Sequence, residues 1–333
     1  MRMVGTVRAN HQGTFPMNFA EFHKTLQDKP TYVILGVQGS GTNLTAQILR
    51  KVFEISVVRD RSLILGTAAS LVGKSSPDNL KRGRDKIYQC LFPSAIRKRL
   101  LPRQWFHQAA NYQGIQDVLH QTAMTSPAEF ADFFYAYHAY VDDCQEKGIK
   151  SDDCWQQLDK IDQVIPHRKN ILLVRDPRDN ANSIMYKDFG PRTVYAASRY
   201  VNHQLDLYLR ETESHPDTSL TTKYETLLAT PHEFVRDFAE LSGLAIPANV
   251  DERIEQLGIR TKNFDKWKRW SPYDIAVSEA IFGDNLTKLG YDPHSTDSIQ
   301  LSATAMARLR AIDIAKRIPQ RLKSIWEHKV LAK

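Results

Sequence analysis

A glycine-rich stretch at residues 36–43 (GVQGSGTN) has the composition of a loop that binds a phosphate. Small residues allow backbone N–H groups to converge on an anion, and the amino end of a following helix adds partial positive charge. Gly36 and Gly41 have the spacing of the glycines in a Walker A loop, but Thr42 and Asn43 stand where that motif has Lys and Ser or Thr. An ordinary nucleoside triphosphatase is therefore disfavoured, and a tight turn without a ligand remains an alternative.

A second stretch with phosphate-binding chemistry is RDPRDNANS, residues 175–183. Arg175 follows an apolar run, and Ser183 comes eight residues later on the helix expected there. A guanidinium group offers a planar set of charged donors and a hydroxyl adds another, so the two side chains can hold one phosphate from two sides. We therefore expect this stretch and the glycine loop to fold together into one anion site.

Each of these loops lies between an apolar strand and a helix. Residues 31–37 and 170–174 are short, continuous apolar runs, which are typical of strands buried on both faces of a sheet. The predicted elements, in chain order, are strand 31–37, helix 42–53, helix 155–164, strand 170–174, helix 179–187, helix 194–213, strand 220–224 and a helix after Pro231. This alternation predicts an α/β fold with a P-loop-type central parallel sheet flanked by helices, in a single domain with a largely helical insert.

Together the two loops resemble those of the PAPS-dependent sulfotransferases of the bacterial P-loop type, whose donor is 3′-phosphoadenosine 5′-phosphosulfate (PAPS). GSGTNL (39–44) is similar to the family's 5′-phosphosulfate loop, and RDPRDNANS is similar to its 3′-phosphate motif. The resemblance implies a sulfotransferase that moves a sulfonate to a hydroxyl or an amine, releases the desulfonated nucleotide (PAP) and needs no metal. The cofactor-binding residues that it implies in these loops are Gln38, Gly39, Ser40, Gly41, Thr42, Asn43, Arg175 and Ser183.

Three further stretches resemble the family in the same order. KYETLL (223–228) is similar to a segment whose tyrosine, here Tyr224, lies near the adenine. DKWKRW (265–270), with the LGY that follows it, is similar to the carboxyl-terminal region of bacterial members. Arg260 then falls where the family has an arginine on the 3′-phosphate, and Lys262 joins the implied nucleotide-binding set.

The reacting end is identified by the resemblance. Family members carry a Lys-Thr-His strand ahead of the 3′-phosphate arginine, and Lys150-Ser151-Asp152 stands at the corresponding distance from Arg175. Lys150 would then contact the sulfonate and Asp152 would be the base, although a solvent-exposed turn would also suit this polar stretch. His107 and His138 compete with Asp152, because a neutral hydroxyl needs a base to become a good nucleophile. A structural role is the alternative for each histidine.

Two positions depart from the family pattern. Gly39 stands where the phosphosulfate loop usually has Lys or Arg, and Leu44 replaces an aromatic residue that stacks on adenine in cytosolic members. Sulfonyl transfer needs positive charge or fixed donors at the bridging oxygen, so another cation would have to reach it. The candidates are Lys150 first, then Arg59, Arg61 and Lys74. The rivals to an active enzyme are a nucleotide-binding relative that has lost catalysis and a small-molecule P-loop kinase.

The formal net charge of +7 is concentrated in one stretch. Residues 81–103 contain eight basic residues and one acid, which suggests an anionic partner or else a solvated basic face. This stretch lies within 60–145, an insert expected to form the acceptor side of a domain that spans 30–333, after an extension at 1–29. The expected partners are an acceptor that is a carbohydrate or another anionic molecule, no nucleic acid, and a second copy of the chain in a homodimer.

The chain has no feature of a membrane or secreted protein. Residues 1–22 lack a continuous apolar block, and no stretch approaches the roughly 20 apolar residues of a spanning helix. Cys90, Cys144 and Cys154 are few, odd in number and without metal-ligand spacing. We therefore expect free thiols and a cytoplasmic protein.

Overall fold

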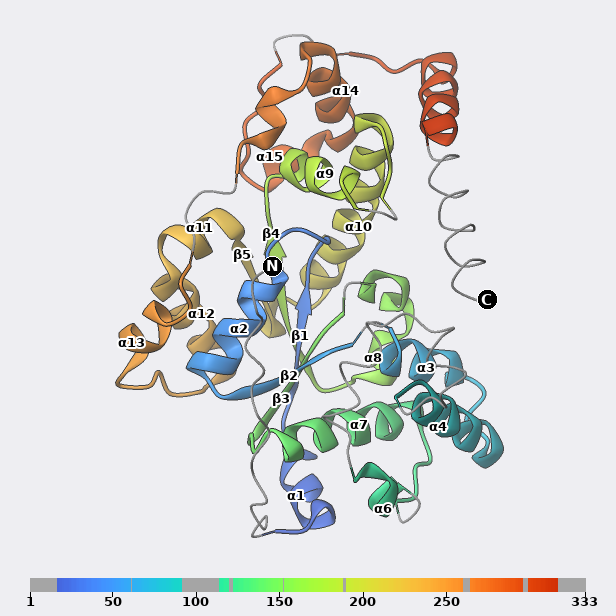
Figure 1. The fold of residues 1–333 in the computed structure, drawn as a ribbon, viewed down its shortest axis with the longest axis vertical. Coiled ribbons are helices and arrows are strands. Elements are labelled where there is room, and N and C mark those ends of the chain that lie inside the picture. Colours follow the sequence, from blue (N-terminus) through green and yellow to red (C-terminus); the bar gives the residue numbers. More distant parts are fainter. Residues whose placement is uncertain are drawn as a thin grey trace, which may run out of the picture.

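The computed structural model describes residues 17–60, 62–91, 114–119, 122–151, 153–187, 190–259, 264–295 and 299–316. Figure 1 shows their arrangement around one central sheet. The elements are α1 (Phe19–Leu26), β1 (Thr31–Leu35), α2 (Thr42–Val52), β2 (Ile55–Arg59), α3 (Ile64–Leu71), α4 (Pro77–Leu91), α6 (Ile115–Leu119), α7 (Pro127–Val141), β3 (Glu146–Lys150), η2 (Cys154–Gln156), η3 (Leu158–Lys160), α8 (Ile161–Val164), β4 (Arg168–Val174), α9 (Pro177–Met185), α10 (Val194–Ser214), η4 (Pro216–Thr218), β5 (Ser219–Lys223), α11 (Tyr224–Ala229), α12 (Pro231–Ser242), α13 (Val250–Glu255), η5 (Lys266–Arg269), α14 (Pro272–Phe282) and α15 (Asp284–Lys288). A further helix covers residues 303–316.

The sheet is parallel throughout, and its five strands have the order β2-β3-β1-β4-β5. The predicted α/β class with a central parallel sheet is therefore confirmed. β1 and β4 are the apolar runs of the sequence, but β2 and β3 were not predicted from periodicity. β3 reads EKGIK, and it enters the sheet because Lys147 is neutralised there: its Nζ donates to the Leu26 carbonyl at 2.8 Å and forms an ion pair with Asp132.

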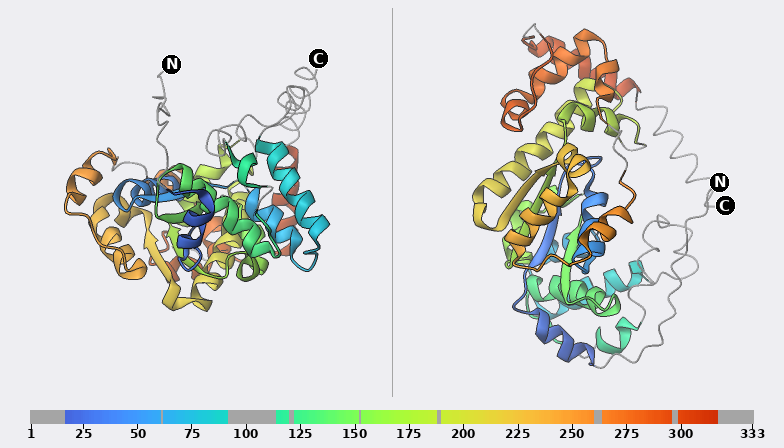
Figure 2. Two further views of the ribbon diagram at one scale, coloured as in Figure 1. Left: turned by 90° about the horizontal axis from the view of Figure 1, so that it is seen from below. Right: turned by 90° about the vertical axis from the view of Figure 1, so that its left-hand side faces the viewer.

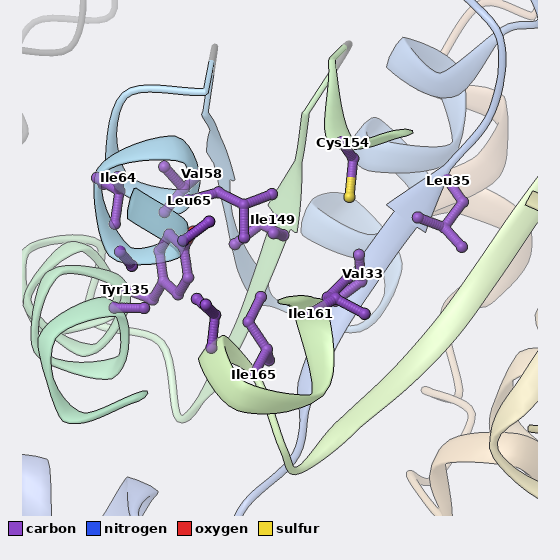
Figure 3. Packing of buried hydrophobic residues seen from close by; sticks show 14 of the residues in the cluster. Val33, Leu35, Val58, Ile64, Leu65, Tyr135, Ile149, Cys154, Ile161 and Ile165 are labelled. Atoms are coloured by element: carbon purple, nitrogen blue, oxygen red, sulfur yellow. The ribbon is translucent and has the colours of Figure 1, made fainter. Parts of the chain in front are cut away.

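Helices cover both faces of the sheet (Figures 1 and 2). Alternate strand residues point to opposite faces, and the core divides accordingly. Val33 and Leu35 lie in the cluster with residues of α1, α3, α7, α8 and α10, part of which Figure 3 shows. Tyr32 and Ile34 lie in the other cluster, with α2, α11, α12 and α13. A strand covered on both sides has no polar face, which explains the continuous apolar run of β1.

Two of the predicted helices differ from the structure. The helix expected over 155–164 is replaced by two 3-10 turns and the short α8. The chain bends there because the ring of Trp155 packs against that of His203 on α10, whereas Ile161 lies in the core. The second difference is that α9 begins at Pro177, two residues before the predicted start, because the Asp176 carboxylate accepts the backbone N–H of Arg178 at 2.9 Å.

The described part of the predicted insert, 60–145, consists of α3, α4, α6 and α7. The aromatic side chains of α7 are buried in the core. Lys81, Arg82 and Lys86 are exposed on α4, while the basic residues at 97–103 lie outside the described residues. The domain limits and the acceptor role of the insert stay predictions.

The three cysteines are free thiols, as the sequence predicted, and Cys154 is the buried one among them. Burial, together with the nearby Asp142 carboxylate, raises the pKa of the Cys144 thiol to about 12. In the part of the chain that the structure covers, no helix combines the length and the apolar character needed to cross a bilayer.

Candidate nucleotide-binding site

The predicted phosphate loops meet at the carboxyl edge of the sheet, where the chain changes direction. After β1 the chain crosses to β2 on one side, and after β4 it crosses to β5 on the other. Ligands of open parallel α/β sheets bind in the crevice outside such a switch point, between the two strands whose connections diverge. β1 and β4 are those neighbours, and the glycine loop and Arg175 follow directly after them.

The glycine loop leads into the amino end of α2. Gly41 is the N-cap with φ 103°, and Thr42 is the first residue of the helix, as predicted. A Cβ at position 41 would lie 2.3 Å from the Tyr224 ring, so the backbone of the loop passes against this ring. Loop residues Gly39 and Asn43 are exposed, whereas Ser40 and Thr42 are buried. The loop therefore presents the N–H groups at the start of α2 to an accessible surface.

Gly39 faces the second predicted loop across a very short gap. A Cβ built at this residue would lie 2.9 Å from the Ser183 Oγ and 3.9 Å from the Asn180 Oδ1, and the Gly39 φ of 94° already disfavours any side chain. Ser183 and Asn180 are one helical turn apart on α9, so the same face of this helix meets the loop. The close contact between the loop and α9 therefore leaves little room for a lysine side chain at position 39.

Arg175 joins the two loops. Its Nη1 donates to the Gly39 carbonyl at 2.9 Å, and its Nη2 lies 3.3 Å from the Asp179 Oδ2. The guanidinium carbon lies 5.0 Å from the centre of the Tyr224 ring. The structure therefore brings together Gly39, Arg175, Ser183 and Tyr224, all of which the sequence assigned to one nucleotide site.

Asp179 is a residue that sequence reasoning missed. Its carboxylate is 0% exposed and accepts the backbone N–H groups of Asp265 at 2.7 Å and of Lys266 at 2.8 Å. A buried carboxylate is stable when several donors and a cation surround it. Asp179 thus fixes the DKWKRW segment against α9 and also contacts Arg175. The available signal was an acidic residue only four positions after Arg175, close enough in sequence to pair with it.

The start of α9 is fixed by a second buried network. Arg178 forms ion pairs with Asp176 at 2.9 Å and with Glu279 on α14, and its guanidinium carbon lies 3.8 Å from the centre of the Trp267 ring. Burial opposes the charged form of Arg178, but its bonds to Asp176 and Glu279 outweigh this and raise its pKa.

A second contact involves Tyr291 of the carboxyl-terminal region. Glu225 accepts a hydrogen bond from the Tyr291 hydroxyl at 2.7 Å, and burial, together with the charge of this carboxylate, raises the pKa of Tyr291. The carboxyl-terminal motifs thus pack onto α9.

Lys150 ends β3 at the same edge of the sheet. It lies in register with Ile34 of β1 and with Arg59 of β2, and it is 3% exposed. The alternative of a solvent-exposed turn at this lysine is therefore wrong. Arg59 ends the outermost strand of that side and is exposed, and Lys74 follows α3.

Asp60, which follows Arg59, positions α3. Its carboxylate is fully buried and accepts three backbone N–H groups at 2.7–3.1 Å, together with the hydroxyl of Tyr135 at 3.0 Å. Burial raises the pKa of Asp60, although these hydrogen bonds oppose the shift. The result is a helix start held rigidly beside the carboxyl end of β2.

His138 lies away from this edge. It is 2% exposed, and its Nδ1 lies 2.7 Å from the Ser56 Oγ, near the beginning of β2. Its contact with Asp142 at 3.1 Å completes a structural cluster. The remaining predicted site residues lie outside the described residues: Asp152, His107, Arg260, Lys262 and Arg61.

The fold and the site define an α/β protein of the P-loop type with a candidate anion site at its switch point. The family model described as the sulfotransferase family matches residues 30–248. The match covers well over half of the sequence, so this chain belongs to the sulfotransferase family. A comparison with curated protein sequences finds no match.

Three solved structures are similar to this chain. The sulfotransferase domain from the curacin biosynthetic pathway has a TM-score of 0.51 at 15% identity, over 79% of this chain and 98% of its own. The sulfotransferase domain of the Synechococcus PCC 7002 olefin synthase has a TM-score of 0.48 at 17% identity, over 79% and 95%. Sulfotransferase STF9 from Mycobacterium avium has a TM-score of 0.47 at 13% identity, over 81% and 82%. At these identities the likeness to the curacin domain speaks for the fold alone.

Proposed function

We propose that this chain transfers a sulfonate from PAPS to a hydroxyl or an amine of an acceptor molecule. The observation that carries the proposal is the contact of the two anion-binding loops: the Gly39 carbonyl accepts from Arg175 at 2.9 Å, and Ser183 faces the same residue. A 5′-phosphosulfate on the glycine loop and a 3′-phosphate on Arg175 and Ser183 would then belong to one nucleotide. The family membership supports sulfotransfer as the chemistry.

In the proposed reaction an acceptor oxygen or nitrogen attacks the sulfur of PAPS. The S–O bond to the 5′-phosphate breaks, PAP leaves with the bonding electrons, and the acceptor proton passes to a base. N–H groups at the start of α2 would stabilise the charge on the leaving phosphate. Lys150, buried beside β1, would supply a cation on the sulfonate side. Asp152 and His107 remain the proposed bases, and Arg260 and Lys262 the further 3′-phosphate ligands.

The acceptor is proposed to be a carbohydrate or another anionic molecule. Lys81, Arg82 and Lys86 support this choice, because they are exposed on α4 within the segment expected to form the acceptor side. Exposed charges attract an anionic ligand and raise its rate of association, an effect that salt weakens. The cytoplasmic location and the homodimer stay predictions.

A relative that has lost catalysis is the second candidate function. Gly39 was the reason for considering it, but the contact of this residue with Ser183 gives the glycine a structural cause. A P-loop kinase is the weaker rival, because Thr42 and Asn43 replace the Lys and the Mg²⁺-binding hydroxyl that phosphoryl transfer requires.

The test is a calorimetric titration with PAP and with Mg²⁺-ATP, followed by measurement of PAP release from PAPS in the presence of candidate acceptors. PAP binding with sulfonate transfer supports the proposal, PAP binding alone supports the relative without catalysis, and Mg²⁺-dependent use of ATP supports a kinase. Arg175→Ala should weaken PAP binding about 30-fold or more, since a hydrogen-bonded charge pair contributes about 2–3 kcal/mol. Arg236→Ala, at an exposed position on α12, is the matched control. Unchanged PAP affinity in the Arg175 variant would remove the assigned 3′-phosphate site.

A further inference from the structure

Asn180 has a buried side chain whose polar atoms lack hydrogen-bond partners among the described residues. The residue is 0% exposed, and within the described ranges neither its Oδ1 nor its Nδ2 has a hydrogen-bond partner. Each unsatisfied buried polar group costs about 1–3 kcal/mol. Native proteins rarely leave such groups unpaired, and ligand sites are one place where they do. Because both ends of the carboxamide are unpaired, exchanging its oxygen and nitrogen leaves the conclusion unchanged.

The position of Asn180 supplies a second, independent observation. It lies one turn before Ser183, on the face of α9 that meets the glycine loop, and its Oδ1 is 3.9 Å from where a Cβ of Gly39 would be. Gly39 is itself exposed, so the carboxamide lies close to an exposed part of the loop, beside Ser183. An apolar residue would fill this position without the energetic cost of unpaired polar atoms. The carboxamide is therefore aimed into the candidate nucleotide site.

We propose that Asn180 is a ligand of the nucleotide, whose amide donates to the 5′-phosphate and thereby replaces the side chain that Gly39 lacks. The inference rests on the proposed function, and it assigns the 5′ end of the nucleotide to Asn180 just as the 3′ end is assigned to Arg175. A neutral donor held in a buried position stabilises charge on the leaving phosphate because it is already oriented before the reaction.

The experiment compares wild type, Asn180→Leu and the control Asn202→Leu. Asn202 undergoes the same change, but its Nδ2 donates to the Ile281 carbonyl at 3.1 Å, away from the site. Thermal unfolding is measured without ligand, and affinities for PAP and for adenosine 5′-phosphate are measured by calorimetry. Leucine has the same number of side-chain heavy atoms and the same branching as asparagine, and it removes both unpaired polar atoms. Asn180→Leu should therefore keep or raise the Tm, whereas Asn202→Leu should lower it.

The affinity of Asn180→Leu for both nucleotides should fall by about tenfold, with the ratio between PAP and adenosine 5′-phosphate unchanged, because the lost bond is to their common 5′-phosphate. Asn202→Leu should bind both as wild type does. Affinities within twofold of wild type in Asn180→Leu would overturn the inference and leave the proposed function intact. A Tm that falls as far as in Asn202→Leu would contradict the unpaired state of the carboxamide. Failure of the wild-type protein itself to bind PAP would overturn the proposed function and this assignment with it.

Discussion

Replacing Gly39 with lysine introduces the residue that the sulfotransferase loop usually has, and here it should damage the site. A Cβ at this position would lie 2.9 Å from the Oγ and 3.2 Å from the Cβ of Ser183, closer than ordinary van der Waals contact. The lysine would also have to adopt the φ of 94° that glycine adopts freely. Either the loop or α9 must move, and both carry the proposed phosphate ligands.

The magnitude follows from these two costs. A side chain at positive φ costs about 1–2 kcal/mol, and overpacking against Ser183 adds about 1–3 kcal/mol, so Gly39→Lys should lose about 2–5 kcal/mol of unfolding free energy. Gly243→Lys separates the backbone cost from the packing cost, because Gly243 has a φ of 77° and a Cβ built there would have nothing within 4 Å. This control should lose about 1–2 kcal/mol and retain nucleotide binding.

The assay is urea denaturation of both variants together with PAP titration and PAP release from PAPS. We expect Gly39→Lys to bind PAP at least tenfold more weakly and to transfer sulfonate more slowly than wild type. A Gly39→Lys protein that is as stable as Gly243→Lys and transfers sulfonate faster than wild type would rule out the steric explanation for Gly39. Gly39 would then mark the loss of a catalytic lysine, and the contact with Ser183 would not explain why glycine occupies this position.

Three further predictions concern the elements around the site. Asp60→Ala removes the acceptor of three backbone N–H groups at the start of α3 and should cost about 2–4 kcal/mol in urea denaturation; a loss below 1 kcal/mol would contradict the capping role. Burial opposes ionisation of Asp132, but its bonds to His23 and Lys147 outweigh burial and lower its pKa. The stabilisation of the fold by ionised Asp132 is therefore complete above about pH 4 and is lost as the pH falls through the lower folded-state pKa. Asp132→Asn should consequently flatten the acid side of a Tm-against-pH curve. An unchanged curve would count against the lowered pKa. Lys150→Met should lower kcat about 100-fold while PAP affinity stays within threefold of wild type, whereas an unchanged kcat would exclude the lysine from the reaction.

Much of the sheet and of the nucleotide site could be predicted from local pattern. β1 and β4 are continuous apolar runs, and the loops after them carry glycines, an arginine and a serine at informative spacing. The order of the strands follows from the fold class rather than from any single residue. The glycine loop and the loop that carries Arg175 meet after β1 and β4, as the sequence analysis predicted.

The rest depends on contacts between distant parts of the chain. β3 was missed because Lys147 can be buried only beside Asp132 and the Leu26 carbonyl, which periodicity does not reveal. The role of Asp179 depends on backbone N–H groups that lie 86 and 87 residues further along the chain. The proposed role of Asn180 depends on its position beside Gly39, which is distant in sequence. Such residues are recognised only when the segments around them have been placed.

If the glycine loop and α9 hold opposite ends of one nucleotide, a crystal structure of the protein with PAP will show both ends in place. We expect the 5′-phosphate over residues 38–43 and the 3′-phosphate within hydrogen-bonding distance of Arg175 and Ser183. A nucleotide bound elsewhere, or one whose 3′-phosphate points away from both side chains, would contradict it.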